Sequence, residues 1–263
     1  MFNVEEQTEK VIDWTRNWMN EKGEDSKAII GISGGIDSST VAAILEKAIG
    51  KERAIAIKLP CGIQKDIDYS NKLIEHLGLT SFEINIGEAY NLLTKEIRKV
   101  SKNGETFPCS AYSTNTPARL RMTTLFGVAA IVGNGYVAGT GNLTEDVVGY
   151  STFYGDGAAS FDPILLFTKK EVIEIAKYLG LPKELYEKTP IDGMSLNDDG
   201  SYKSDEQKLG FTYEEVGNTI RTGNRGEHYD KILNMFNRNK FKNEIVRLPH
   251  YEPNLPISSE FRF

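Results

Sequence analysis

The chain has few of the residues that usually mark a secreted protein, a metal cluster or a membrane protein. It has only two cysteines, Cys61 and Cys109, and their spacing fits neither a disulfide framework nor a zinc site. Its three histidines, His76, His228 and His250, are scattered, and we interpret each as a structural or surface residue. No apolar run reaches membrane-spanning length and no signal or transit peptide is recognisable. We therefore expect a soluble, cytoplasmic protein.

The chain also lacks the basic charge of a protein that binds nucleic acid through its surface. Its formal net charge is −6 at pH 7, so we expect any nucleotide to occupy a local site, with neither nucleic acid nor membrane as a partner. The hydrophobic content of 40% is enough for a sizeable core. The length fits one domain over residues 1–263.

What the chain does have is an alternation of apolar strand patterns and amphipathic helix patterns. This alternation predicts a doubly wound α/β fold, in which helices cover both faces of a mostly parallel, five-stranded sheet. Segment 190–210 is polar and turn-rich, and we expect a mobile loop there, either a plain surface loop or a lid over a substrate. Strands are expected at 28–32, 53–59, 81–86 and 135–140, and helices at 4–21, 38–49, 66–77, 88–101, 117–131 and 169–179.

The most informative segment is the loop between the first strand and its helix. Residues 31–39 read Gly-Ile-Ser-Gly-Gly-Ile-Asp-Ser-Ser. Small residues let the backbone approach an anion, and the N-terminus of the following helix offers unpaired N–H groups and a positive dipole end. The segment therefore predicts a phosphate-binding loop, although it lacks the lysine of a Walker A motif. The alternative is an ordinary connection in which Ser and Asp only cap the helix.

A second group of small and polar residues follows the fourth expected strand, at 139–145, and ends in Glu145. The carboxyl ends of parallel strands share one edge of a sheet, so Glu145 and Asp37 come close if the first and fourth strands are neighbours. Carboxylates, together with phosphate oxygens and water, are the ligands that Mg²⁺ prefers. The sequence thus predicts Mg²⁺ at Asp37 and Glu145. The alternative for Glu145 is a solvated acid at a helix start.

The loop at 31–39 resembles the pyrophosphate loop (SGGxDSS/T) of ATP pyrophosphatases, which split ATP into AMP and pyrophosphate. Further segments extend the resemblance to ammonia-dependent NAD synthetases. It implies a Rossmann-like fold of the adenine nucleotide alpha-hydrolase type. It also implies that ATP adenylates the nicotinate carboxylate of deamido-NAD and that ammonia then attacks the acyl carbon. The matching segments, in the family's order, are 31–39, 58–60, 115–122, 139–145, 154–157, Pro163 with Lys169, and 205–210.

The resemblance also implies roles for individual residues. Asp37 and Lys169 would be catalytic, and Asp37 and Glu145 would bind Mg²⁺. The ATP ligands would be Lys58, Thr140, Lys169 and the whole loop: Gly31, Ile32, Ser33, Gly34, Gly35, Ile36, Asp37, Ser38 and Ser39. The ligands of deamido-NAD would be Arg119, Phe153, Asp156, Ser160 and Lys242.

The resemblance further implies a homodimer with the substrate at the subunit interface. Arg119 would then reach the site of the partner subunit, from an apolar helix at 117–131 that also suits a plain core helix. About 27 residues precede the first expected strand. A glutamine-using synthetase carries a large additional amidase domain, which those residues do not accommodate, so we expect free ammonia as the nitrogen donor.

Four positions depart from the family's usual pattern. Many members have Lys at the position of Phe153, Asp at that of Ser160, Ser or Thr at that of Ile191, and a His–Lys pair in place of Phe241–Lys242. All four lie on the acyl-substrate side or in the expected lid. Two other interpretations therefore stay open: an ATP pyrophosphatase that amidates a different carboxylate, and a nucleotide-binding module without turnover.

Overall fold

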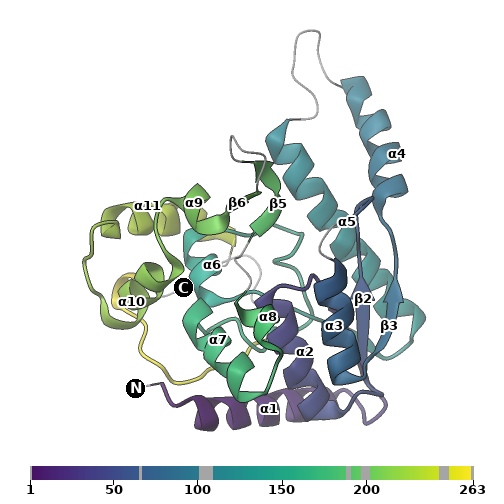
Figure 1. The fold of residues 1–263 in the computed structure, drawn as a ribbon, viewed down its shortest axis with the longest axis horizontal. Helices are drawn as coiled ribbons and strands as arrows, with labels where there is room; N and C mark the ends of the chain where they lie inside the picture. The colour runs from purple at the N-terminus through teal and green to yellow at the C-terminus, as the bar shows by residue number, and fades with distance from the viewer. Residues whose placement is uncertain are drawn as a thin grey trace.

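The computed structural model, which describes residues 2–64, 67–100, 109–187, 191–196, 202–242 and 249–261, is built around a four-stranded parallel sheet (Figure 1). The strands lie in the order β3–β2–β1–β4, and β1 at the centre pairs in parallel with both β2 and β4. The predicted parallel α/β fold is confirmed, and the first and fourth strands are neighbours. The strands are β1 Lys27–Gly31, β2 Ala54–Lys58, β3 Thr80–Glu83 and β4 Gly135–Ala138.

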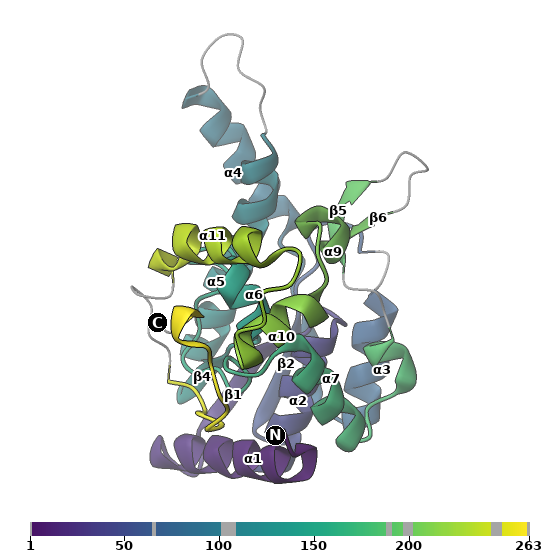
Figure 2. The same cartoon turned by 90° about the vertical axis from the view of Figure 1, so that its left-hand side faces the viewer.

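Helices cover both faces of the sheet. On one face α1, α2 and α7 pack against one another, and on the other α5 packs against β1 and β4. Helix α4 and the start of α5 project away from the rest of the molecule (Figure 1, Figure 2). The helices are α1 Val4–Glu21, α2 Ile36–Ile49, α3 Ile67–Leu77, α4 Gly87–Ile97, α5 Ser110–Ile131, α6 Leu143–Val148, α7 Lys169–Tyr178, α8 Lys183–Tyr186, α9 Asp205–Leu209, α10 Tyr213–Thr222 and α11 Tyr229–Asn239.

Successive residues of the central strand face two different hydrophobic clusters. Ala28 and Ile30 of β1 belong to the cluster formed with α1, α2 and α7, whereas Ile29 belongs to the cluster on the α5 side. A third cluster joins α6, α10 and α11. Because both faces of β1 are buried, its carboxyl end and the loop that follows are held in a fixed position. Among the described residues, no helix has both the length and the apolar character needed to cross a membrane.

Two predictions about the elements were wrong in detail. Within the described ranges the parallel sheet has four strands and not the expected five; beyond β4 the pairing consists of isolated bridges, Ala138 with Phe161 and Asp162 with His250. The helix expected to begin at Pro117 begins at Ser110 and contains this proline. Proline prefers the first turn of a helix and costs a hydrogen bond in the interior. Packing of the earlier turns overrides this preference, since the Tyr112 and Tyr90 rings lie 5.9 Å apart.

The segment predicted as a loop at 190–210 contains regular structure. β5 Ile191–Leu196 and β6 Tyr202–Ser204 form an antiparallel pair, and α9 follows directly. Residues 188–190 and 197–201 lie outside the described residues. The mobility of the segment and its role as a lid stay predictions.

Candidate active site

The predicted phosphate loop joins β1 to α2, and its backbone requires glycine at one position. Gly34 has a φ of +76°, and a Cβ there would lie 2.8 Å from Cβ of Tyr69. The N-cap of α2 is Gly35, which offers no side-chain acceptor to the first turn of the helix. The hydroxyls of Ser33 and Ser38 lie 3.1 Å apart beside it. A helix start with hydroxyls and no anionic cap is suited to a phosphate.

Lys169 connects the two predicted metal ligands. Its Nζ donates hydrogen bonds of 2.6 Å to Oδ2 of Asp37 and to Oε1 of Glu145. Asp37 lies in the first turn of α2 after β1, Glu145 lies in α6 after β4, and Lys169 is the first residue of α7. Because β1 and β4 are neighbours, the three side chains meet at the carboxyl edge of the sheet, as the sequence predicted for the two carboxylates.

Burial and charge shift the protonation of this cluster. Burial raises the pKa of Glu145 to about 7, against the opposing effect of Lys169. Burial disfavours the charged form of Lys169, yet its two carboxylate partners raise the pKa of its ammonium. The ring of Tyr213 lies 5.2 Å from Nζ and adds a cation–π contact. The buried Lys169 ammonium is therefore stabilised in its charged form by these two carboxylates.

Two residues that the sequence analysis did not single out hold the cluster together. Asn142 donates from Nδ2 to Oδ1 of Asp37 at 3.0 Å, and its Oδ1 accepts from the N–H of Glu145 at 3.1 Å. One amide thus caps α6 and orients a carboxylate of α2. Thr144 accepts on Oγ1 from the N–H of Lys169 at 2.9 Å. Asn three residues before Glu is an N-cap pattern that the sequence could have revealed; the partner of Thr144 depends on the fold.

The first turn of α7, which carries Lys169, is fixed from a second side. Thr168 and Glu171 form a capping box, in which each side chain accepts from the other residue's N–H. The Glu171 carboxylate also accepts from Arg221, at 2.9 Å from Nε and 2.7 Å from Nη2. This paired geometry is the strongest that arginine makes with a carboxylate. The backbone of Lys169 is therefore anchored at several points.

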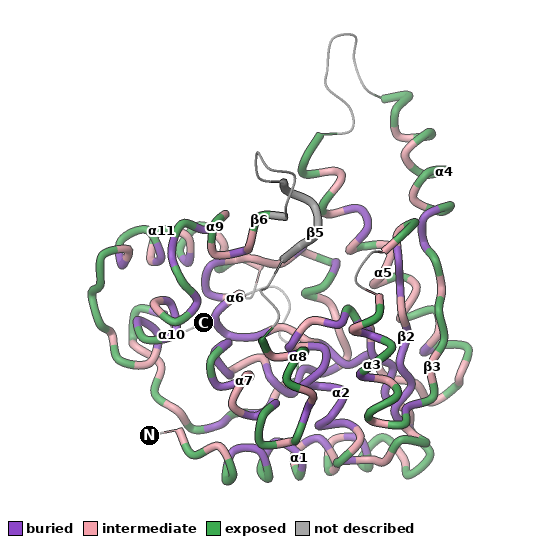
Figure 3. Tube along the Cα trace, viewed as in Figure 1, coloured by how far each residue is buried: buried purple, intermediate pink, exposed green. Residues whose placement is uncertain are grey.

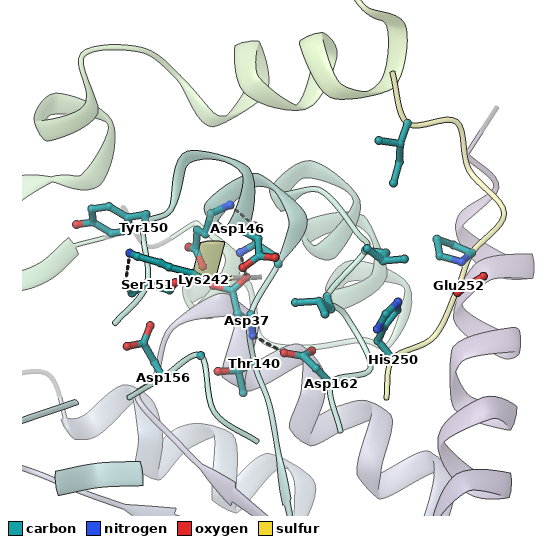
Figure 4. Close-up of a pocket in the computed structure, with 18 of the residues that line it drawn as sticks. Asp37, Thr140, Asp146, Tyr150, Ser151, Asp156, Asp162, Lys242, His250 and Glu252 are labelled. Carbon is teal, nitrogen blue, oxygen red and sulfur yellow. Dashed lines mark hydrogen bonds between the residues drawn. The ribbon is translucent and has the colours of Figure 1, made fainter. Parts of the chain in front are cut away.

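A cavity of about 890 Å³ opens beside this cluster, at a size typical of ligand sites. Its walls come from the phosphate loop, the segment after β4, the loop at 149–157 and the C-terminal segment 250–257 (Figure 4). Several predicted site residues line it: Ser33, Asp37, Ser38, Thr140, Glu145, Phe153, Asp156 and Lys242.

On the predicted acyl-substrate side, Lys242 and Asp156 shape the loop at 149–157. Lys242 donates to the carbonyl oxygens of Gly149 and Ser151 at 2.8 and 2.7 Å, and burial lowers its pKa. Asp156 accepts from the N–H of Thr152 at 2.9 Å, and burial raises its pKa. Both charged groups face the cavity while they brace its wall (Figure 4).

Arg119 of α5 contacts the loop at 149–157, which forms one wall of the cavity. Its Nε donates to the carbonyl oxygen of Phe153 at 3.2 Å, within one chain. The Phe153 ring lies 5.7 Å from the ring of Phe241. Two of the departures noted in the sequence are thus neighbours in space and give this wall an aromatic character.

Four predicted site residues outside the glycine-rich loop do not line the cavity: Lys58, Arg119, Ser160 and Lys169. Lys58 donates to Oδ1 of Asn71 at 2.8 Å and pairs with Glu83 at 3.1 Å. Ser160 accepts on Oγ from the N–H of Val137 at 3.0 Å, which ties it to β4. The side chains of Lys58 and Ser160 are satisfied by the fold itself in this arrangement. Other predicted ATP ligands form the loop backbone or the buried side of α2 without lining the cavity: Gly31, Ile32, Gly34, Gly35, Ile36 and Ser39.

The donor chemistry of Asp37 and Glu145 fits Mg²⁺. Each directs a carboxylate oxygen at the same point, since both oxygens contact one ammonium nitrogen. Within the part of the chain that the structure describes, no group of three or more His, Cys, Asp or Glu side chains could enclose a metal. A pair of carboxylates is sufficient for Mg²⁺, which usually takes its remaining ligands from phosphates and water.

Comparisons with known proteins show the family to which the chain is similar. The model of the NAD synthase family matches residues 7–252. The NH(3)-dependent NAD(+) synthetase of Carboxydothermus hydrogenoformans is 35% identical over 252 residues, which cover 94% of this chain and 98% of that protein. The protein of the same name from Archaeoglobus fulgidus is 31% identical, over 93% of this chain and 96% of its own length.

Two solved structures are similar along almost the whole chain. The NMN synthetase from Francisella tularensis has a TM-score of 0.81 at 28% identity, covering 95% of this chain and 100% of that one. The NH3-dependent NAD synthetase from Campylobacter jejuni has a TM-score of 0.71 at 25% identity, covering 94% and 99%.

Proposed function

The chain belongs to the NAD synthase family, and on that premise we propose that it is a ligase that amidates deamido-NAD to NAD with ammonia, consuming ATP and releasing AMP and pyrophosphate. The observation that supports this most is the meeting of Asp37, Glu145 and Lys169 at the start of α2, beside a cavity large enough for nucleotides. Residues 1–263 form the catalytic unit as a single domain in this proposal.

The chemistry requires activation of a carboxylate, which is a poor electrophile until one oxygen becomes a good leaving group. Adenylation supplies that group, and the pyrophosphate that departs must be neutralised and held in place. The loop from Gly31 to Ser39 would hold the phosphates, with Lys58 and Thr140 as further ATP contacts. Lys169 would neutralise phosphate charge. Mg²⁺ held by Asp37 and Glu145 would supply further neutralisation.

The acyl substrate would lie against the loop at 149–157. Asp156 and Lys242 are the charged groups that face the cavity there. Phe153 contributes an aromatic surface, and Arg119 lies close enough to hydrogen-bond the Phe153 carbonyl. Ser160 would act through its tie to β4 rather than by direct contact.

A mononucleotide is a second candidate substrate, namely the acid form of nicotinamide mononucleotide. The Francisella tularensis structure, which is named as an NMN synthetase, matches with a TM-score of 0.81 over 95% of the chain. The acyl side also departs from the usual family pattern at Phe153 and Ser160. Both candidates carry the same nicotinate carboxylate, so the phosphate half of the site serves either.

We also place a homodimer interface at α5 and a cytoplasmic location in this proposal. α5 is rich in apolar residues, yet only Thr116, Pro117 and Ala129 among its 22 residues are buried. Ile131 is 86% exposed and Phe126 is 37% exposed, and Figure 3 shows much of α5 and α4 in the exposed and intermediate colours. Such a surface is typical of a protein–protein interface.

The free cysteines Cys61 and Cys109 fit a reducing compartment.

The test is a reaction of the protein with ATP, Mg²⁺, ammonium and one carboxylate at a time. NAD, AMP and pyrophosphate in equal amounts from deamido-NAD support the primary proposal. A preference for the mononucleotide acid in kcat/KM supports the second candidate. AMP formed only with another acid favours a different amide synthetase, and ATP binding without AMP favours a module without turnover.

A further inference from the structure

The carboxylates of Asp37 and Glu145 repel each other electrostatically, and a cation between them would offset this repulsion. Their side chains are only 18% and 20% exposed, and both direct an oxygen at one point. Two like charges placed together and partly removed from water repel each other strongly. A cation between them is therefore needed whenever both are ionised.

Lys169 supplies that cation, with its Nζ 2.6 Å from an oxygen of each carboxylate. Mg²⁺ binds carboxylate oxygens at about 2.0–2.1 Å and demands near-octahedral geometry. Asp37 and Glu145 would hold Mg²⁺ through their carboxylate oxygens, and the Lys169 ammonium already contacts one oxygen of each. The two cations therefore compete for these oxygens.

The anchoring of Lys169 allows its side chain to leave while its backbone stays. The N–H is held by Thr144 at 2.9 Å, and the capping box and Arg221 fix the turn around it. The contacts that hold the ammonium are all made by the tip of a flexible four-carbon stem. Rotation about that stem can move the ammonium away from the carboxylates without disturbing α7.

We propose that Lys169 is the resident counter-cation of Asp37 and Glu145, and that its ammonium leaves them for the nucleotide phosphates when Mg²⁺ arrives with ATP. This inference rests on the proposed function, in which these carboxylates hold Mg²⁺. The exchange keeps the charges paired at each stage. The arriving dication replaces the Lys169 ammonium beside the carboxylates, and the ammonium pairs with the phosphates that arrive with it. It also makes the binding of metal and of nucleotide cooperative.

The experiment measures binding of Mn²⁺, a paramagnetic substitute for Mg²⁺, by electron paramagnetic resonance in the absence of nucleotide. We expect weak binding to the wild-type protein and at least tenfold tighter binding to Lys169→Met, because the competing ammonium is gone. The matched control is Lys170→Met. This neighbouring lysine is 60% exposed and pairs with Glu214, so its loss should leave the Mn²⁺ affinity unchanged.

Thermal unfolding gives a second readout that does not depend on activity. Without metal, Lys169→Met should have a lower melting temperature than the wild type, because its two carboxylates lack their cationic partner. Added Mg²⁺ should raise the melting temperature of the variant more than that of the wild type. Lys169→Gln keeps a polar side chain and should give the same order of melting temperatures. It replaces Lys169→Met in this experiment if the methionine variant folds only with metal.

Equal or weaker Mn²⁺ affinity in both variants would overturn the exchange. A different result would refute the proposed metal site itself. In that case the wild type would not bind Mn²⁺ even with a non-hydrolysable ATP analogue, and the Asp37→Asn variant would give the same result. Nucleotide-dependent Mn²⁺ binding by the wild type, without a gain in the Lys169 variants, refutes the exchange alone.

Discussion

The hydroxyl of Thr144 accepts a hydrogen bond from the backbone N–H of Lys169 at 2.9 Å, and both groups are buried. The bond joins the first turns of α6 and α7, two helices that are separated in the sequence by residues 149–168. Because Glu145 is the residue next to Thr144, this bond also sets the spacing between the carboxylate of Glu145 and the ammonium of Lys169. The geometry of the candidate active site thus depends on a neutral hydroxyl that makes no contact with the metal position in this arrangement.

Replacing Thr144 with valine keeps the shape of the side chain and removes the acceptor. The N–H of Lys169 is then buried without a partner, which costs about 1–3 kcal/mol of unfolding free energy. We expect kcat for pyrophosphate release to fall at least tenfold, with a smaller change in KM for ATP. Thr144→Ser, which keeps the hydroxyl, should retain most of the activity. Wild-type turnover by the valine variant would show that the bond does not position the site.

Replacing Asp37 with asparagine removes a negative charge at the proposed metal position while preserving size. We expect pyrophosphate release to fall to background, because phosphate charge is no longer neutralised by a metal at this position. Circular dichroism should show an unchanged fold. Asp68→Asn, at an exposed position in the first turn of α3, serves as the control and should retain full activity. Near-wild-type turnover in Asp37→Asn would refute the metal assignment.

Mixed dimers test whether Arg119 serves the site of the partner subunit. The protein would be prepared as Arg119→Ala and as Lys169→Met, each inactive alone, and the two would be mixed under conditions that exchange subunits. If Arg119 acts across the interface, one site in each mixed dimer has both residues intact and activity returns. If it acts in its own chain, where it contacts the Phe153 carbonyl, verified mixed dimers stay inactive.

A charge placed on the exposed face of α5 tests the proposed dimer. Ile131 is 86% exposed, and Ile131→Glu would bury an unpaired carboxylate if this face is covered by a second subunit. We expect light scattering after size exclusion to show a dimer for the wild type and a monomer for the variant. Tyr178→Glu, at a residue of α7 that is 43% exposed, should leave the mass unchanged. A wild-type monomer would contradict the proposal.

The buried carboxyl of Asp162 predicts a dependence of stability on pH. Burial raises its pKa well above the ordinary value of 3.8, so the folded protein holds this proton more tightly than the unfolded chain. The stability that this group contributes is complete below the unfolded pKa and is lost as pH rises through the folded pKa. Asp162→Asn cannot titrate at this position.

We therefore expect the unfolding free energy of the wild type to decline relative to that of Asp162→Asn as the pH rises above the ordinary carboxyl pKa of 3.8. Urea denaturation of both proteins at a series of pH values measures the difference. A difference in unfolding free energy that stays constant at all pH values would mean that the Asp162 carboxyl has the same pKa in the folded and unfolded states. The comparison uses a change with pH, so it is independent of the hydrogen bonds from Gly141 and Ile164 that the substitution also alters.

Much of the fold could be predicted from the sequence because its signals are local. Short apolar runs and helical periodicity located β1, β2 and β4 and the helices around them, and the glycine-rich loop appeared where it was expected. The start of α5 was missed because Pro117 is a local signal for a helix beginning, while packing against α4 extends the helix before it. The sequence predicted a five-stranded parallel sheet, but within the described residues only isolated bridges occur beyond β4.

The sequence by itself determined the glycine-rich loop between β1 and α2 and the prediction that Asp37 and Glu145 meet at one sheet edge, since parallel strands end together. Only the tertiary structure decided which side chains complete the site. Lys169 turned out to sit between the two carboxylates, Asn142 to bridge Asp37 and α6, and Lys58 to pair with Glu83 instead of facing the cavity. The reason is physical: partners far apart in the chain meet through strand order and helix packing, which no local period in the sequence encodes.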